Sequence, residues 1–354
     1  MNPLEHELSY PFGQRLPAEA QRIEVAEGVH WIRMPLPFAL DHINLWLLRD
    51  RFEGREGWTL IDCGIASDAI RGLWERLFAD GLDGMPIVRV IATHTHPDHV
   101  GLAHMITERF ACPLWMTIGE YAMGRVLSAA MPGADGSSAA AHFRRHGVPD
   151  GAQLEAIRNR NIRYFRSLVP AMPLSFRRIR EGDVVHIGAS EWRVIVGIGH
   201  SPEHAALYCP ESRTLISGDM VLPRISTNVS VFELEPESNP VDWYLASLEK
   251  FDACAADTLV LPSHGRPFRQ LHRRLNQLRE HHVERLELVE PACRDAPKCA
   301  FDIVPIMFRR EFDTHQLTFA LGEALAHLHA LWYRGMLVRI EGDDAVMRFE
   351  PSRR

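Results

Sequence analysis

An α/β fold is the class that the sequence predicts, because short apolar runs alternate with segments of helical periodicity along most of the chain. The 354 residues are 46% hydrophobic and 24% charged, a composition typical of globular proteins that excludes a disordered or collagen-like chain. The second half of the sequence repeats the alternation of the first half. A chain of this length forms one large domain, or one large domain with a small addition.

Residues 22–116 contain the clearest strand signals, which are apolar and β-branched runs ending at glycine or at polar loops. Ser67 suits a helix N-cap, and Ile70, Leu73 and Leu77 follow at helical spacing. The expected elements are strands at 22–27, 29–34, 44–49 and 58–62, a helix from Ser67 to Gly81, a strand at 88–92, a helix at 100–110 and a strand at 113–116.

Between residues 119 and 174 the strand pattern disappears and apolar residues recur at helical spacing. We expect a helical insert there. Its aromatic and aliphatic residues either form an apolar wall beside a site or anchor the insert to the rest of the domain. Strands are expected again at 192–197, 205–209, 213–217 and 258–261.

The pattern changes once more after residue 268, which divides a domain at 1–268 from a C-terminal domain at 269–354. Leucines at helical spacing predict a long helix from Leu271 to Val289 and a second helix from Leu317 to Trp332. Two short strands at 336–340 and 345–349 flank an acidic turn. Helices followed by a β-hairpin have the outline of a winged-helix-like α+β module.

The charge and the cysteine content indicate which classes of partner and which cellular compartment to expect. The formal net charge of −7 provides no broad cationic field for nucleic acid or an anionic membrane. No apolar run reaches the length of a membrane span, and the N-terminus has no apolar signal segment. We therefore expect a cytoplasmic protein. Buried reduced thiols are expected for the six cysteines, at positions 63, 112, 209, 254, 293 and 299.

The strongest chemical signal is His94-x-His96-x-Asp98-His99, directly after an apolar strand. Neutral imidazoles and carboxylates at this spacing bind zinc and related dications, whereas the pattern has no advantage for packing. Further candidates follow other apolar runs and can meet the first group at one sheet edge. They are His200, Asp219 and His264.

These motifs resemble, in the same order over residues 20–268, those of the metallo-β-lactamase superfamily, with Asp62 as the first motif. The resemblance implies an αββα sandwich with two divalent metal ions at its edge. One ion would be held by His94, His96 and His200, the other by Asp98, His99 and His264, with Asp219 between them. Ligands without thiolate suit Zn²⁺, and Mn²⁺ or Fe²⁺ would also be accommodated.

The same resemblance implies hydrolysis by a metal-bound hydroxide, since divalent ions lower the pKa of bound water to about 7. Asp98 would orient the nucleophile and transfer a proton as the catalytic residue. Asp62 would orient a ligand histidine or a loop amide, or only cap a turn. His204 would support the site or lie at the surface, and Ser226 and Asn228 are close enough in sequence to reach it. Cys63 is expected to be a packing residue.

Three functions are compatible with this site. The first is a hydrolase of a small-molecule thioester, of the acyl-CoA or S-acylglutathione type, or of a lactone, as in glyoxalase II/thioesterase-like members. The alternatives are an endoribonuclease or other nuclease, and a non-catalytic binding protein. Residues 269–354 contain 14 basic and 13 acidic residues, a net charge of +1, which disfavours nucleic acid. The C-terminal domain would instead support packing, a homodimer or a pocket wall. Six arginines of the insert are cationic contacts for an anionic substrate or a solvated helix face: Arg144, Arg145, Arg158, Arg160, Arg163 and Arg166.

Overall fold

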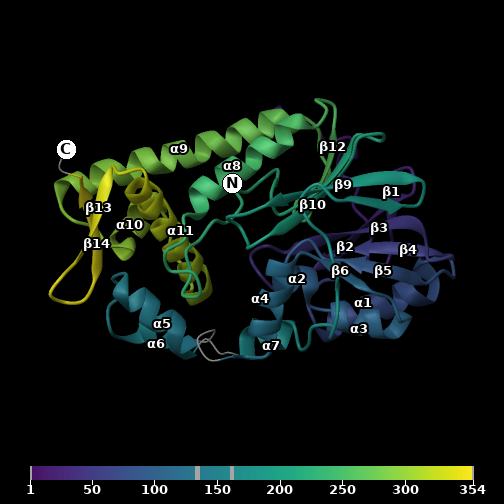
Figure 1. Cartoon of the computed structure of the whole chain (residues 1–354), viewed down its shortest axis with the longest axis horizontal. Helices are drawn as coiled ribbons and strands as arrows, with labels where there is room; N and C mark the ends of the chain where they lie inside the picture. The colour runs from purple at the N-terminus through teal and green to yellow at the C-terminus, as the bar shows by residue number, and fades with distance from the viewer. Residues whose placement is uncertain (1, 132–135, 160–162, 353–354) are drawn as a thin grey trace.

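Two β-sheets pack face to face with helices on both outer sides, as the computed structural model shows (Figure 1). It describes residues 2–131, 136–159 and 163–352. The mixed α/β class and the αββα layering are therefore as predicted. Within these described ranges, no helix has the length and apolar character required to cross a lipid bilayer.

The first sheet has seven strands in the order of the sequence. Its first four strands are antiparallel. The later strands are parallel because helical segments connect them, namely α1 (Asp68–Arg76), α3 (Ala103–Phe110) and the helical insert. The strands are β1 (Ile23–Ala26), β2 (Val29–Pro35), β3 (His42–Phe52), β4 (Arg55–Ile61), β5 (Ile87–Ile91), β6 (Leu114–Met116) and β7 (Arg177–Arg178).

The second sheet has five strands in the order β12-β11-β10-β9-β8. Neighbours from β8 to β11 are antiparallel, whereas β11 and β12 are parallel and are joined through helix α8 (Pro240–Glu249). The strands are β8 (Val184–Ile187), β9 (Ser190–Gly197), β10 (His204–Cys209), β11 (Thr214–Gly218) and β12 (Leu259–Pro262).

Three hydrophobic layers hold the sandwich together. Trp31, Trp46 and Leu207 belong to the layer between the two sheets. A second layer, with Leu60 and Ile106, lies between the first sheet and its helices. The third layer lies outside the second sheet and extends into the C-terminal helices. Burial of apolar surface in these layers fixes both sheet faces, so the loops at the strand ends are left to form the site.

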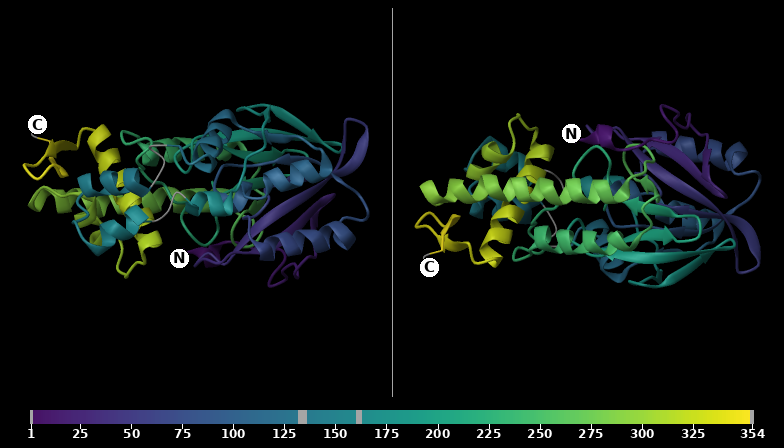
Figure 2. Two further views of the ribbon diagram at one scale, coloured as in Figure 1. Left: turned by 90° about the horizontal axis from the view of Figure 1, so that it is seen from below. Right: turned by 90° about the horizontal axis from the view of Figure 1, so that it is seen from above.

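The C-terminal part contains helices α9 (Leu271–Asp295), α10 (Ala300–Met307) and α11 (Thr314–Tyr333), then the antiparallel hairpin of β13 (Leu337–Glu341) and β14 (Met347–Pro351). The hairpin lies at the opposite end of the molecule from β1 and β4, and α9 runs from the sandwich toward the hairpin (Figures 1 and 2). The expected helices and hairpin are present. Their likeness to a winged helix, and the division of the chain near residue 268, stay predictions.

The insert is helical, as expected, but its helices divide between two surroundings. They are α4 (Ile118–Ser128), α5 (Gly136–Arg145), α6 (Ala152–Asn159) and α7 (Arg163–Leu168). Phe143 and Ile157, from α5 and α6, share one core with the C-terminal helices (Figure 1). Tyr121 and Phe165, from α4 and α7, pack on the outer layer of the first sheet. The insert therefore connects the sandwich with the C-terminal helices.

Several elements differ from the sequence-based expectation. In place of the single helix expected at 100–110, the structure has α2 (Pro97–Val100) followed by α3. Leu102, between them, departs from the helical conformation with a φ of −102° and a ψ of 10°. A π-helical turn, Leu77–Gly81, extends α1 to the expected end. Strands β7 and β8 and helices α8 and α10 were not predicted. Strand β8 is only four residues long, and α10 contains Pro305, a residue that disfavours a helix interior.

Candidate metal centre

Four loops at strand ends bring the seven predicted ligands together. The loop after β5 contains His94 and His96, and Pro97 begins α2, whose first turn holds Asp98 and His99. The remaining three are His200 in the loop before β10, Asp219 directly after β11 and His264 after β12. Backbone hydrogen bonds fix these loops, since Ala205 N donates to Thr93 O across the two sheets at 2.8 Å.

One group of possible metal-binding side chains consists of His94, His96, His200 and Asp219, whose ligand atoms all lie within 4.8 Å of one another. His94 Nε2 lies 2.8 Å from His96 Nδ1 and 3.3 Å from His200 Nε2. His200 Nε2 is 3.4 Å from Asp219 Oδ2. Three imidazoles and one carboxylate oxygen therefore surround one point.

The other group consists of Asp98, His99 and His264. His264 Nε2 lies 3.3 Å from Asp98 Oδ2 and 3.4 Å from Asp219 Oδ1. His99 Nε2 lies 3.6 Å from each of the same two oxygens. Asp219 thus presents Oδ2 to the first group and Oδ1 to the second, which is the arrangement expected of a side chain between two cations.

The spacing and the unsatisfied atoms fit divalent metal ions. Two ligand atoms about 2.1 Å from a tetrahedral ion are about 3.4 Å apart, close to the distances in both groups. Among the described residues, His99 Nε2 and Asp219 Oδ1 are buried without a hydrogen-bond partner. Buried polar atoms without a partner are costly, so these two atoms call for a ligand at this point.

The ligand histidines are held in one orientation through their second ring nitrogens. His200 Nδ1 lies 2.7 Å from Asn228 O, and His264 Nδ1 lies 2.7 Å from His42 O. A backbone carbonyl oxygen can only accept a hydrogen bond, so each Nδ1 carries the hydrogen and each Nε2 offers a lone pair. This is the usual second contact of a metal-binding histidine.

Charge is distributed unevenly over the two groups. Burial lowers the pKa of His94 far below its ordinary value and that of His96 to about 3, so both imidazoles are neutral. Burial also opposes protonation of His99 and His264. The carboxylates of Asp219 and Asp98, with Asp62 beside His99, outweigh that effect and raise both pKa values. The site therefore attracts positive charge, which divalent cations would supply.

Asp62 touches both a ligand histidine and a backbone amide. Its Oδ2 lies 2.7 Å from His99 Nδ1, and its Oδ1 accepts a 2.8 Å hydrogen bond from Thr93 N. The residue has a φ of +61°, a left-handed conformation that costs energy for a residue with a β-carbon. Its carboxylate is buried and holds the loop of Thr93 and His99 in place.

His204 is buried behind the first group rather than at the surface. Its Nε2 accepts a 3.0 Å hydrogen bond from Asp219 N, which fixes the backbone of the residue between the two groups. A β-carbon at Gly218 would lie 2.2 Å from this nitrogen, so only glycine fits there. Asn228 reaches the site through its carbonyl oxygen, and Ser226 is half-buried in the same loop. Cys63 is buried beneath the first sheet's helices.

Three supporting residues were not predicted. Asn44 is fully buried in β3 and donates to Pro262 O and Gly265 O at 2.8 and 2.9 Å, which holds the loop of His264. His42 Nε2 accepts from Gly265 N in the same loop. Glu120, at the start of the insert, accepts from Thr95 N between two ligand histidines. A polar asparagine within the apolar run 43–48 was the one signal in the sequence.

Three arginines of the insert pair with acids. Arg144 contacts Asp150 and Arg158 contacts Glu155, whereas Arg145 reaches Glu341 of the C-terminal hairpin at 3.5 Å. Arg166 is exposed. Arg160 and the side chain of Arg163 lie outside the described part. Whether these arginines contact an anionic substrate or form a solvated helix face stays a prediction.

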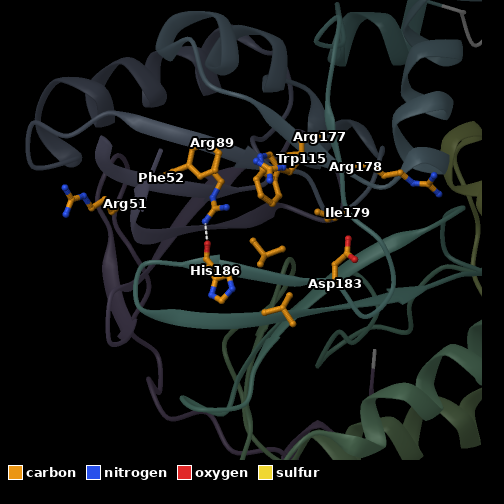
Figure 3. A pocket seen from close by; sticks show the side chains of 11 residues that line it. Arg51, Phe52, Arg89, Trp115, Arg177, Arg178, Ile179, Asp183 and His186 are labelled. Carbon is orange, nitrogen blue, oxygen red and sulfur yellow. Dashed lines mark hydrogen bonds between the residues drawn. The ribbon is translucent and has the colours of Figure 1, made fainter. Parts of the chain in front are cut away.

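A cavity of about 420 Å³ lies elsewhere, where β7 of the first sheet faces β8 of the second. Figure 3 shows Arg89 donating to the carbonyl oxygen of His186, while Arg51 and Arg178 point away from the cavity. Arg89 is neutralised by Asp50, at 2.8 Å. The predicted ligands are not among the lining residues, so this cavity is separate from the candidate metal centre.

Comparisons with known families agree with this geometry. The model of the "Metallo-beta-lactamase superfamily" matches residues 39–264, and the model of the "Metallo-beta-lactamase-like, C-terminal domain" matches residues 286–352. Among curated proteins, the chain is 24% identical to the "Probable metallo-hydrolase YqjP" of Bacillus subtilis, over 86% of this chain and 92% of that protein. It is 29% identical to the "Acyl-coenzyme A thioesterase MBLAC2" of Gallus gallus, over 69% and 80% of the two chains.

Solved structures show the same relationship. A "Beta-lactamase domain protein" from Burkholderia ambifaria has 57% identity and a TM-score of 0.93, with 99% of this chain and 100% of that chain covered. A metallo-beta-lactamase family protein from Thermus thermophilus has 27% identity and a TM-score of 0.74, with 93% and 100% covered. The chain therefore belongs to the metallo-beta-lactamase superfamily, and it is a hydrolase of that superfamily.

Proposed function

We propose that the protein hydrolyses a small-molecule thioester, with two divalent metal ions bound in the site. The observation that carries this proposal is the position of Asp219, whose two carboxylate oxygens face two separate groups of ligands. A site for a single ion would need only one of these groups.

The first ion would be held by His94, His96 and His200, and the second by Asp98, His99 and His264, with Asp219 contacting both. Divalent ions in such a site activate water as a nucleophile near neutral pH and polarise the group under attack. Zn²⁺ suits these nitrogen and oxygen ligands best, although Mn²⁺ and Fe²⁺ share the preference.

Asp98 is the acidic ligand best placed to act on substrate. Its side chain is 17% exposed, whereas those of His99 and His264 are at most 3% exposed. A carboxylate that contacts the second group and also reaches solvent can orient a nucleophile and accept its proton. His264 Nε2 lies 3.3 Å from Asp98 Oδ2.

The name of one relative favours a thioester, and the distribution of charge disfavours nucleic acid. One relative is named as an acyl-coenzyme A thioesterase. In addition, the balanced charge of residues 269–354 provides no strongly cationic surface for nucleic acid, and Arg144 and Arg158 of the insert are paired with acids. A lactone is the second small-molecule substrate that the same chemistry would accept.

Two further proposals concern the setting of the enzyme. All six cysteines are buried and free of disulfides, which suits the reducing cytoplasm. The C-terminal helices and hairpin, winged-helix-like in outline, share a core with α5 and α6. We assign them a packing role, in which they support α5 and α6 of the insert.

A substrate panel tests the function. Purified protein is assayed with acyl-CoAs, S-acylglutathiones, an acyl-homoserine lactone and single-stranded RNA, each with and without a metal chelator. We expect turnover of a thioester that chelator abolishes and added Zn²⁺ restores. Cleavage of RNA alone would assign a nuclease, and tight binding of small molecules without any turnover would assign a binding protein.

A further inference from the structure

Glu120 links two of the loops that supply ligands to the first group. It lies in the first turn of α4, and its side chain is fully buried. Its Oε2 accepts a 2.9 Å hydrogen bond from Thr95 N, in the loop of His94 and His96. Its Oε1 accepts a 2.8 Å bond from Glu203 N, in the loop that follows His200. One carboxylate thus spans two loops that are more than 100 residues apart in sequence.

The loop of His200 holds the start of α4 in return. Glu203 Oε2 accepts a 2.8 Å hydrogen bond from Gly119 N, and Thr117 Oγ1 donates to Glu203 O at 2.8 Å. A β-carbon on Gly119 would come within 3.1 Å of the Glu203 carboxylate. The first turn of the insert and this ligand loop therefore form one closed set of contacts.

The free-energy cost of burying polar groups without hydrogen bonds explains why these contacts fix the positions of the two loops. Burial raises the pKa of Glu120, since a carboxylate loses its water there, whereas the two backbone donors act in the opposite direction. Without Glu120, the N–H groups of Thr95 and Glu203 would lose a buried acceptor. Each unsatisfied group costs about 1–3 kcal/mol, so the two loops would shift to find other partners.

We propose that Glu120 is a positioning residue that sets the separation of His94 and His96 from His200, and that it controls metal affinity at the first group alone. The second group has its own supports, because Asp62 holds His99 and the backbone of His42 holds His264. This inference rests on the metal-binding role proposed above. It assigns a specific task to the insert, which supplies none of the predicted ligands.

The substitution Glu120→Gln removes one of the two acceptor oxygens with little change in the shape of the side chain. Glutamine keeps one acceptor oxygen, but it points an NH₂ donor at the N–H of the other loop. Glu203→Gln is the matched control, because it removes a negative charge nearby yet retains the single acceptor that Gly119 N needs. The pair therefore distinguishes loop geometry from electrostatics.

Affinity for Zn²⁺ is measured by competition with a chromophoric chelator, without any assay of turnover. Each variant is combined with His264→Ala, which leaves the first group, and with His200→Ala, which leaves the second. We expect Glu120→Gln to weaken Zn²⁺ binding about 10- to 100-fold at the first group, the usual effect of losing a residue that orients ligands. Glu120→Gln should leave Zn²⁺ affinity at the second group within about twofold of that of the protein with Glu120. Glu203→Gln should leave Zn²⁺ affinity at either group within the same range.

Equal affinity of Glu120→Gln and the parent at the first group would overturn the inference, and so would an equal loss at both groups. Thr117→Val removes only the hydroxyl bond to Glu203 O and provides the answer if Glu120→Gln does not fold. We expect it to weaken the first group about two- to fivefold with no effect on the second, the loss of one neutral hydrogen bond. A parent protein that binds no Zn²⁺ would instead refute the proposed function itself.

Discussion

His99 and Asp62 form a buried pair in which Nδ1 and Oδ2 are 2.7 Å apart. The carboxylate requires a hydrogen on Nδ1, so Nε2 is left to face Asp98 and Asp219 as a ligand atom. The tautomer of a ligand histidine is thus set by a residue 37 positions earlier, at the end of a neighbouring strand.

Asp62→Asn should reverse this preference. The amide oxygen can still accept from Thr93 N, but the NH₂ group then faces His99 Nδ1 and favours the hydrogen on Nε2. We expect about a 10- to 100-fold loss of metal affinity at the group of Asp98, His99 and His264. Chelator competition measures it, with exposed Asp80→Asn as the control. Unchanged affinity would show that Asp62 does not orient His99.

Asp219→Ala should remove most of the bound metal, because its oxygens face both groups. Elemental analysis of the purified variant should find less than half of the metal of the parent protein, and turnover should fall with it. Asp343→Ala, in the exposed turn of the C-terminal hairpin, serves as the control. Retention of two ions per chain in Asp219→Ala would contradict the bridging position.

Arg89→Met should destabilise the fold without involving the metal centre. Arg89 and Asp50 are each 2% exposed, and the substitution leaves a buried carboxylate without its partner. We expect a loss of about 3–5 kcal/mol in the free energy of unfolding, measured in urea. The double variant Arg89→Met/Asp50→Asn should recover part of that loss. A double variant less stable than the single one would refute this explanation.

Stability should fall in mild acid because of buried histidines between the C-terminal helices. His327 Nε2 lies 3.1 Å from His282 Nδ1, and burial lowers the pKa of His327 to about 4. The unfolded chain titrates near pH 6.5, so it binds a proton that the folded state excludes. This contribution is complete above about pH 6.5 and is lost as the pH falls toward 4.

Urea unfolding of metal-depleted protein between pH 7.5 and 4.5 measures this dependence. His327→Gln removes one of the titrating groups, so its free energy of unfolding should decline less steeply with acid than that of the parent. Metal depletion excludes the separate effect of losing ions as ligands protonate. Parallel pH profiles for the two proteins would show that folding does not lower the pKa of His327.

The sequence predicted that seven His and Asp residues would lie together, because their signal is local and chemical. His94 to His99 lie in one loop, and His200, Asp219 and His264 each follow an apolar strand. Sheet topology then brings those strand ends to one edge. The alternation of strands and helices predicted the layers for the same reason, since each signal is contained in a short window.

Contacts between distant segments could not be predicted in this way. Glu120 resembles any helical glutamate in the sequence, and its role depends on a loop 83 residues later. The packing of α5 and α6 on the C-terminal helices likewise depends on tertiary contacts rather than on periodicity. Strand β8 was missed because a run of four residues is too short to be assigned by periodicity, although three of the four are apolar.

Elemental analysis of the purified wild-type protein tests the central claim most directly. The two groups of ligands predict two divalent ions per chain. Chelator should remove both ions and abolish thioesterase activity, and added Zn²⁺ should restore both the bound metal and the activity. A well-folded protein that binds no divalent ion, or that hydrolyses its substrate equally well after complete removal of metal, would contradict the account.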